Sequence, residues 1–354
     1  MAVMEYKEVL KRMRLRRLIG FIIICLCCPP LYAGIHSSFG STLLYNKTFD
    51  SNLFRIPESN TDSSLHKSVF INTVGGNVNG EVEVSRQKFR WNANLYNVEY
   101  EGYKYLNYIS GFGDFKWDWL YAKRLSGYIQ VGAERRKNTS DEYIYVDNKI
   151  LRRSIKSRVE YSIGSDRYLS LVVKLTDVEN SNPNLQAVNR LVRTFRLSTF
   201  QRNEANTEGG LYYETRLGEF PDRDLTNVSF LDDRFIQTSG GAYANFYPTR
   251  RVFVKTTAGL TMREYNRPGV RGYQGWVAGL YSRWNMTDKI NISANIDRDI
   301  KTVEEENSNY YVVDSAQLEG EWRLTYKISI FSSISMQRRN YNVYNSLGEK
   351  NDTL

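Results

Sequence analysis

The sequence offers few side chains of the kinds that enzymes use for catalysis. Its only two histidines, His36 and His66, have no Cys, His or carboxylate beside them at metal-ligand spacing. A zinc site or a Ser-His hydrolase is therefore poorly supported, because both need an imidazole with defined partners. We expect no enzyme, no catalytic residue, and no metal or other cofactor.

Pairs of carboxylates are the remaining catalytic candidates, since two acidic groups can hydrolyse a glycosidic bond. They are Asp232-Asp233, Asp297/Asp299, Glu304-Glu305-Glu306 and Glu319/Glu321. The first and third lie in predicted loops. The others alternate along predicted strands and would be balanced by neighbouring interior bases such as Arg298 and Arg323. A carbohydrate-cleaving hydrolase that uses Asp297 and Asp299 is thus only a minor alternative.

A larger set of charged and amide side chains recurs at every second position of apolar stretches. The run Phe89, Trp91, Ala93, Leu95, for example, alternates with polar residues. Alternation with period two is typical of a strand that has one apolar and one polar face. The residues that we expect to line a polar interior are Arg90, Asn92, Asn94, Lys116, Asp118, Arg158, Glu160, Asn291, Asn295, Asp297, Asp299, Glu319, Glu321 and Arg323.

These interior side chains allow two interpretations. Charges and amides, with tyrosines among them, could hydrogen-bond to and stack on a hydrated polysaccharide. A porin interior, however, needs polar side chains merely to hold water. From the residues alone, both interpretations stay open.

The same alternation predicts fifteen strands. They span roughly 38–48, 67–75, 82–97, 105–121, 125–136, 150–163, 168–176, 187–199, 209–217, 234–247, 251–263, 272–285, 289–300, 310–324 and 327–340. Short connections are expected at Gly75-Gly76-Asn77, Lys123-Arg124, Gly164-Ser165-Asp166-Arg167, Pro248-Thr249-Arg250, Thr287-Asp288 and Thr325-Tyr326. Longer polar connections are expected at 50–66, 137–149, 177–186, 218–233, 264–271 and 301–309, with 199–208 as a long link where a short one is due.

Long and short connections that alternate are typical of a transmembrane antiparallel up-and-down β-barrel, which has tight periplasmic turns and larger external loops. In hydrocarbon every strand amide must be paired, so the sheet has to close. A soluble β-sandwich is the alternative, although its strands are more often short. Aromatic residues near strand ends suit the girdles of a barrel at the membrane interfaces. They are Trp119, Tyr121, Trp276, Trp284, Trp322 and Tyr341.

The odd strand count is unusual, because bacterial single-chain barrels generally have an even number. The sequence also stops at Leu354, in what looks like an external loop. We therefore expect about sixteen strands in the complete all-β barrel, with the C-terminal strand missing here. The alternative is that one strand, such as the first, is over-counted. The predicted barrel domain spans 34–354, truncated at its C-terminus.

Residues 1–33 have the pattern of a secretory signal peptide. Six Lys and Arg residues precede the apolar stretch 18–28, and Ala33 is the small residue at the expected cleavage point. Eleven residues as a helix span about 16 Å, too little for a hydrocarbon core of roughly 30 Å. Cys25, Cys27 and Cys28 all lie in this segment, so the mature chain is not a disulfide scaffold. We expect export and residence in the outer membrane of a Gram-negative bacterium.

The charge of the chain argues only weakly for an anionic ligand. The full sequence has 48 Lys and Arg against 39 Asp and Glu, a net charge of +9. Segment 1–33 contains six of these bases and two of these acids, which leaves 42 and 37, or +5, for the mature chain. This mixed charge gives little support for a nucleic-acid partner.

Two segments resemble a family, the EpsL-like outer-membrane β-barrel proteins of exosortase-associated extracellular polysaccharide gene clusters, within a broader β-barrel porin grouping. The first is Asp50-Ser51-Asn52-Leu53-Phe54-Arg55-Ile56-Pro57. The second is Asp222-Arg223-Asp224-Leu225, followed by Phe230-Leu231-Asp232-Asp233-Arg234-Phe235-Ile236-Gln237-Thr238. The hairpin pattern is similar over most of 34–340. Family members continue through a last strand, and this sequence departs from them there.

The resemblance implies an outer-membrane barrel that serves the assembly or export of an extracellular polysaccharide. Its partners would be the polysaccharide chain and outer-membrane lipid, beside periplasmic export proteins and an inner-membrane polymerase. It carries over no catalytic residues. The residues that match the second motif are Asp222, Asp224, Asp232, Asp233 and Arg234. We expect them to form a structural external loop that folds over the mouth by Asp–Arg pairing, in preference to direct ligand contact. A general diffusion porin for small solutes is the alternative function.

Overall fold

The computed structural model describes residues 36–51, 53, 68–137, 147–225, 232–268, 270, 272–302, 308–326, 328–343 and 351–353. The predicted signal peptide, His66 and the run Glu304-Glu305-Glu306 lie outside the described residues. So do Phe54-Arg55-Ile56-Pro57 and Phe230-Leu231 of the two motifs.

The described chain is almost entirely β-structure, and the predicted all-β antiparallel up-and-down fold is confirmed. Fifteen long strands and one short strand follow one another: β1 (His36–Asp50), β2 (Val69–Val84), β3 (Gln87–Tyr100), β4 (Tyr108–Tyr121), β5 (Leu125–Lys137), β6 (Lys149–Ile163), β7 (Arg167–Asn180), β8 (Arg190–Arg202), β9 (Glu208–Glu219), β10 (Arg234–Thr249), β11 (Val252–Tyr265), β12 (Tyr273–Asn285), β13 (Ile290–Thr302), β14 (Ser308–Arg323), β15 (Ser329–Val343) and β16 (Asn351–Thr353). Two 3-10 helices, η1 (Lys104–Leu106) and η3 (Pro183–Val188), lie in connections. In the described ranges, no helix has the length and apolar character needed to cross a membrane.

One predicted turn is wrong. Gly75-Gly76-Asn77 lies in the middle of β2, and the chain turns instead at 85–86, where Ser85 adopts a φ of 56°. The glycine at 75 is explained by packing, because a Cβ there would stand 2.2 Å from the carbonyl oxygen of Leu95 and 2.3 Å from a ring carbon of Tyr96. Glycine in a strand often marks such a close approach and not only a turn.

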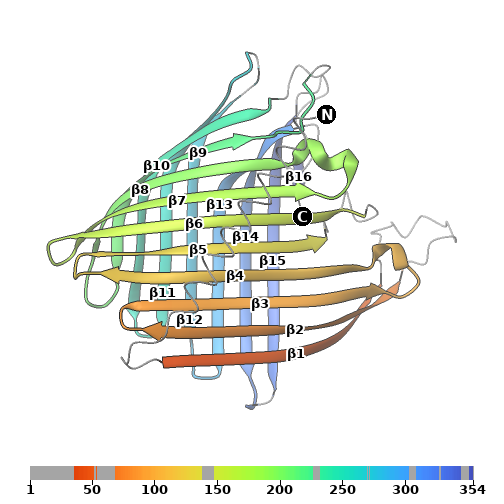
Figure 1. Ribbon diagram of the computed structural model, residues 1–354, viewed down its shortest axis with the longest axis horizontal. Helices are drawn as coiled ribbons and strands as arrows, with labels where there is room; N and C mark the ends of the chain where they lie inside the picture. The colour runs from red at the N-terminus through yellow and green to blue at the C-terminus, as the bar shows by residue number, and fades with distance from the viewer. Residues whose placement is uncertain are drawn as a thin grey trace.

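Each strand pairs antiparallel with the next, so that the order in the sheet is the order in the sequence. From β1 to β12 the longer connections follow odd-numbered strands and the shorter ones follow even-numbered strands, whereas the link after β13, 303–307, is also short. The predicted exception at 199–208 is also wrong, because β8 continues to Arg202 and leaves a link of only 203–207. In Figure 1, β1 to β6 run across the front of the view while β13 to β15 run behind them in a crossing direction, so the sheet curls around an interior. This is the strand arrangement of an outer-membrane β-barrel.

The first and last strands of the sheet each pair with one neighbour, β1 with β2 along its whole length and β16 with β15 over a few residues. β16 pairs with β15 only between 351–353 and 338–340. Within the described ranges, no pairing joins β1 to β15 or to β16.

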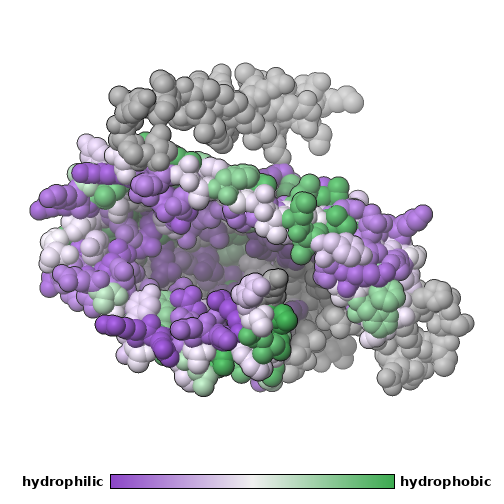
Figure 2. Space-filling model, turned by 90° about the horizontal axis from the view of Figure 1, so that it is seen from below, coloured by the Kyte–Doolittle hydropathy of each residue, from purple (hydrophilic) through white to green (hydrophobic). Residues whose placement is uncertain are grey.

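The two faces of the sheet differ in chemistry. On β7, Leu169, Leu171, Val173 and Leu175 are all exposed at alternate positions, and Lys174 points to the opposite face. The same alternation of exposed apolar residues continues on the other strands. Figure 2 shows the molecule hollowed, with hydrophilic residues around the hollow. The apolar face is therefore the convex one, and the polar face surrounds the interior.

The aromatic residues expected near strand ends do not all lie on the apolar face. Trp119 packs over Gly127, and the four that are exposed on the outer face are Tyr121, Trp276, Trp284 and Trp322. Tyr341 is only 4% exposed and packs on Tyr311, with 5.2 Å between ring centroids. Tyr311 lines the interior cavity, so the placement of Tyr341 in an outer girdle is wrong.

Two adjacent glycines of β10 provide a test of the register. A Cβ on Gly241 would stand 2.2 Å from the carbonyl oxygen of Ala258 in β11, whereas the nearest atom to a Cβ on Gly240 is 3.9 Å away. We expect Gly241→Ala to lower the free energy of unfolding by about 1–3 kcal/mol, the usual range for overpacking. Gly240→Ala is the matched control and should change it by less than about 0.5 kcal/mol. Urea unfolding followed by tryptophan fluorescence measures both, and equal losses would contradict this register.

Candidate functional site

The polar face of the sheet forms a continuous interior wall. Residues directly opposite each other on paired antiparallel strands share a face. Starting from Arg90, the register carries one row of polar side chains across nine strands: Arg90, Lys116, Gln130, Lys156, Lys174, Thr194, Arg216, Gln237 and Arg263. The site is therefore built by strand pairing, not by any single loop or motif.

The predicted interior residues of β3 and β4 form one polar cluster. Asp118 accepts from Arg90 at 2.5 Å and pairs with Lys116 at 2.8 Å. Asn92 accepts from Asn77 at 2.5 Å. Asn94 lies directly opposite Asn77 on the same face. Arg90, Asn92 and Lys116 line a recess of about 530 Å³.

The predicted residues of β6 form a second cluster farther along the wall. Arg158 and Glu160 form an ion pair, and Arg202 of β8 lies 3.5 Å from Glu160. Arg202 also pairs with Glu208 at 2.8 Å. Glu160 is thus held between two arginines, and Glu208 is held by one of them.

The predicted residues of β13 and β14 make up the third cluster. Each carboxylate of this cluster has a polar or basic partner. Glu321 accepts from Asn291 at 2.9 Å and pairs with Arg323 at 2.7 Å, and Glu319 accepts from Ser293 at 3.0 Å. Asp297 accepts from Asn295 at 3.2 Å, and Asp299 pairs with Lys301 at 2.9 Å. Arg298 does not belong to this set. It lies under Trp276 of the outer face, 4.5 Å from that ring, and pairs with Asp314 at 3.1 Å, so its assignment to the interior is wrong.

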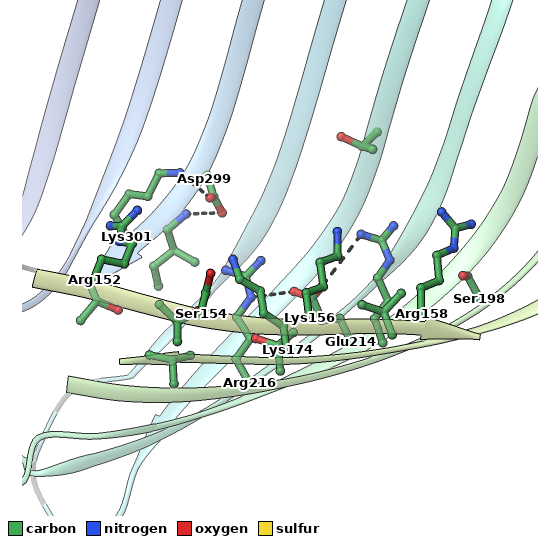
Figure 3. A pocket seen from close by; sticks show the side chains of 18 of the residues that line it. Arg152, Ser154, Lys156, Arg158, Lys174, Ser198, Glu214, Arg216, Asp299 and Lys301 are labelled. Carbon is green, nitrogen blue, oxygen red and sulfur yellow. Dashed lines mark hydrogen bonds and ion pairs between the residues drawn. The ribbon is translucent and has the colours of Figure 1, made fainter. Parts of the chain in front are cut away.

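A cavity of about 1040 Å³ lies between the second and third clusters. Its lining includes ten basic side chains against four acidic ones, Glu134, Glu208, Glu214 and Asp299. Figure 3 shows Arg152, Lys156 and Lys174 on the same side of this cavity, with Asp299 and Lys301 across from them. The interior is therefore strongly positive at this level.

Several of these basic residues were missed from the sequence. The alternation assigned to β6 began at Ile155, although Arg152, Ser154 and Lys156 continue the polar face toward the start of the strand. Extending the period-two pattern back from Arg158 by three alternate positions would have found Lys156, Ser154 and Arg152.

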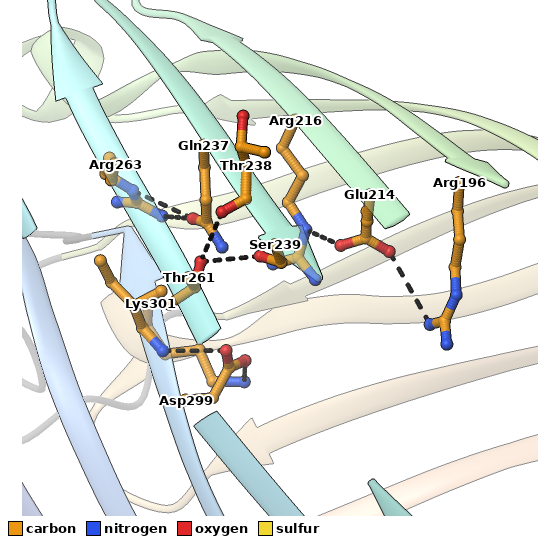
Figure 4. A network of polar contacts seen from close by, with 11 residues as sticks. Arg196, Glu214, Arg216, Gln237, Thr238, Ser239, Thr261, Arg263, Asp299 and Lys301 are labelled. Atoms are coloured by element: carbon orange, nitrogen blue, oxygen red, sulfur yellow. Dashed lines mark hydrogen bonds and ion pairs between the residues drawn. The ribbon is translucent and has the colours of Figure 1, made fainter. Parts of the chain in front are cut away.

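Beside the cavity, the interior face of β10 and β11 carries a buried polar network. Arg263 is only 2% exposed and donates through Nε and Nη2 to the Gln237 side-chain oxygen, at 3.1 and 2.6 Å. Ser239 and Thr261 share a hydrogen bond of 2.7 Å, and Thr261 also donates to the carbonyl oxygen of Thr238 (Figure 4). These buried groups make the wall rigid where it faces the cavity.

The second motif folds into a loop cluster that joins three connections and the start of β14. Arg223 donates to the backbone carbonyl oxygens of Asp232 at 2.6 Å and Ala187 at 3.3 Å, and to the side chain of Asn309 at 3.3 Å. Its guanidinium lies over the Phe220 ring at 3.8 Å. Burial lowers the pKa of Arg223 to about 10. The anchor of this cluster is thus a buried arginine that bonds carbonyl groups.

The acidic residues of the motif take different positions in this loop cluster. Asp232 is buried and accepts from the backbone N–H groups of Arg267 at 2.6 Å and Arg234 at 3.2 Å. Asp222 accepts from Asn189 at 2.8 Å, and Asp224 is exposed. Asp233 lies 3.9 Å from Arg234, and burial together with the neighbouring Asp232 raises the pKa of Asp233. The described motif residues therefore make mainly structural contacts.

Comparison with known proteins gives only distant likenesses. No protein-family model matches the chain, and no curated protein matches it. The alcaligin outer membrane receptor FauA from Bordetella pertussis is 12% identical, with a TM-score of 0.39, over 88% of this chain and 52% of that one. The siderophore receptor PirA from Acinetobacter baumannii is 11% identical, with a TM-score of 0.40, over 92% and 58%. The copper transporter OprC is 10% identical, with a TM-score of 0.42, over 92% and 57%. The chain thus spans little more than half the length of these proteins.

The loop cluster can be tested by removing its anchor. Arg223→Gln loses the bonds to two backbone carbonyl groups and leaves them buried, so we expect the free energy of unfolding to fall by about 2–3 kcal/mol. Arg234→Gln is the matched control, because this exposed arginine only approaches Asp233, and it should cost less than about 1 kcal/mol. Urea unfolding measures both variants. The structural role of Arg223 would be contradicted if the two variants lost equal stability.

Proposed function

We propose that this chain is an outer-membrane β-barrel channel or export component through which an extracellular polysaccharide leaves a Gram-negative cell. The observation that carries the proposal is the apolar convex face. Leu211, Leu260, Ile296 and Ile334 are between 56% and 71% exposed there, far from any buried core. Soluble proteins rarely expose large contiguous apolar surfaces, whereas hydrocarbon favours such a face.

The interior supports transport of a hydrated cargo. Paired charges and amides line the wall, and the cavity of about 1040 Å³ lies among them. Tyrosine rings also face this space, among them Tyr128 and Tyr243. Aromatic rings with a polar tip offer both a flat apolar surface and a hydrogen bond to a sugar. A polysaccharide fits this combination.

The resemblance of the two motifs to the EpsL-like family supports the same proposal, because that family serves the assembly or export of an extracellular polysaccharide. The residue pattern of 1–33 supports export of the chain with this segment as its signal peptide. The chain would work beside periplasmic export proteins and an inner-membrane polymerase. A general diffusion porin is the second candidate, and the observation in its favour is that the wall charges are mostly neutralised by their own neighbours.

Channel recordings separate the two functions. The purified chain in planar bilayers should conduct ions, and polysaccharide fragments should block the current while simple sugars should not. If polysaccharide fragments and simple sugars passed through the channel equally well, the diffusion porin would be favoured. Failure of every fragment to interact with the conducting protein would contradict polysaccharide transport.

The membrane position of the sheet gives a second prediction. Leu318 of β14 is 50% exposed on the apolar face, and its neighbour Gln317 points to the interior, where it donates to Glu319 at 2.8 Å. Arginine on the lipid face near the bilayer midplane costs about 2–4 kcal/mol. We therefore expect Leu318→Arg to make folding into lipid vesicles less favourable by about 2–4 kcal/mol.

Gln317→Arg is the matched control, since it places the same charge one residue away beside Glu319. It should fold into vesicles nearly as well as the parent chain. If both arginines were tolerated equally, the convex face would not be in hydrocarbon.

A further inference from the structure

The positive charge of the interior cavity is concentrated where β6 and β7 pair. Lys156 of β6 and Lys174 of β7 lie directly opposite each other, and both line the cavity. Arg152 lies on the same face of β6, two alternate positions from Lys156, with Ser154 between them. We call these three residues the basic trio.

Glu134 of β5 lies directly opposite Arg152 but forms no ion pair with it, and no acidic residue of the described wall is left to neutralise Lys156 and Lys174. Each of the four acids of the cavity has a basic partner other than these three: Glu134 with Arg136 at 3.8 Å, Glu208 with Arg202 at 2.8 Å, Glu214 with Arg216 at 2.6 Å, and Asp299 with Lys301 at 2.9 Å. In the described part of the chain, no carboxylate comes within 4.0 Å of a basic nitrogen of the trio. The remaining charged neighbours of Lys174 are Arg152, Arg216 and the already paired Glu214.

This arrangement opposes folding. Like charges directly across two paired strands are destabilising, by up to about 1 kcal/mol. Elsewhere in the same wall a carboxylate offsets that cost: Arg90 and Lys116 also lie directly opposite each other, but both pair with Asp118. An unneutralised group of bases inside a large cavity is the arrangement expected of an anion-binding site.

We propose that the basic trio binds carboxylate groups of an acidic polysaccharide as the chain passes through the barrel. This deepens the proposed function, on which it rests, by assigning the class of cargo. Four residues of strand separate Arg152 from Lys156, or about 13 Å. The two ends of the trio can therefore hold carboxylates on different sugar units of one chain. Arginine binds a carboxylate through a planar fork, and the two lysines provide charge without fixed direction.

Direct binding tests the assignment without requiring conduction. The full chain in detergent micelles is titrated calorimetrically with a galacturonate hexamer, with the neutral hexamer maltohexaose and with monomeric galacturonate. We expect the acidic hexamer to bind most tightly and its binding to weaken as salt is raised. The double variant Lys156→Gln/Lys174→Gln should bind it about tenfold or more weakly.

Two controls keep this result interpretable. Lys88→Gln removes one interior lysine that is paired with Glu81 at 2.5 Å, and it should leave hexamer binding within about twofold. Lys156→Arg/Lys174→Arg keeps both charges and should retain binding. Because repulsion is relieved, the glutamine double variant should unfold at the same or a higher urea concentration than the parent, so lost binding cannot be ascribed to lost structure.

The assignment is overturned if the glutamine double variant binds the acidic hexamer as tightly as the parent. It is also overturned if maltohexaose or monomeric galacturonate binds as tightly as that hexamer. The proposed function fails separately. A chain whose current is blocked by neutral and acidic fragments alike would still be a polysaccharide channel without this selectivity, whereas a chain that binds the acidic hexamer but never conducts would keep the site and lose the channel.

Discussion

The register of strand pairing is the constraint on which the rest of this structure depends. In a β-strand successive side chains point to opposite faces, so a slip of one residue between two strands would exchange the faces of everything beyond it. From β1 to β15 the register runs with irregularities only between Phe246 and Thr249 and between Ser308 and Tyr311 in the described residues. An apolar exterior and a polar interior can coexist in one thin wall only because this register holds.

Close packing of glycine helps to hold that register. Gly241 of β10 lies opposite Gly259 of β11, and a Cβ on either would collide with backbone of the other strand. The loop cluster acts at one end of the same strands, where Arg223 ties the connections around β8, β10 and β14 together. The interior between these parts is therefore fixed in shape before any cargo enters. Its charges divide into pairs that neutralise each other and a smaller basic group, Arg152, Lys156 and Lys174, that forms no ion pair in the described wall.

The sequence predicted the strands well because their signal is local. Alternation alone located fifteen strands, and most bounds agree within a few residues. The error at Gly75-Gly76 arose because glycine signals both turns and close packing, and only the position of Tyr96 on the next strand decides between them. The wrong face for Tyr341 has a similar cause, since its ring partner Tyr311 is known only from the pairing of β14 with β15. The loop cluster could not be predicted from the sequence, because Ala187 and Arg223 come from different connections and Asn309 from the start of β14, all distant in the chain.

The central claim is that one face of each strand meets lipid and the other meets water. Cysteine labelling tests it directly, because all three cysteines of the sequence precede residue 34 and the described strands contain none. On β13, Asn295 faces the interior and Ile296 is 56% exposed on the outer face. In vesicles, a charged water-soluble thiol reagent should label Asn295→Cys and leave Ile296→Cys unlabelled until the protein is unfolded. Equal labelling of the two positions in the folded protein would contradict the account.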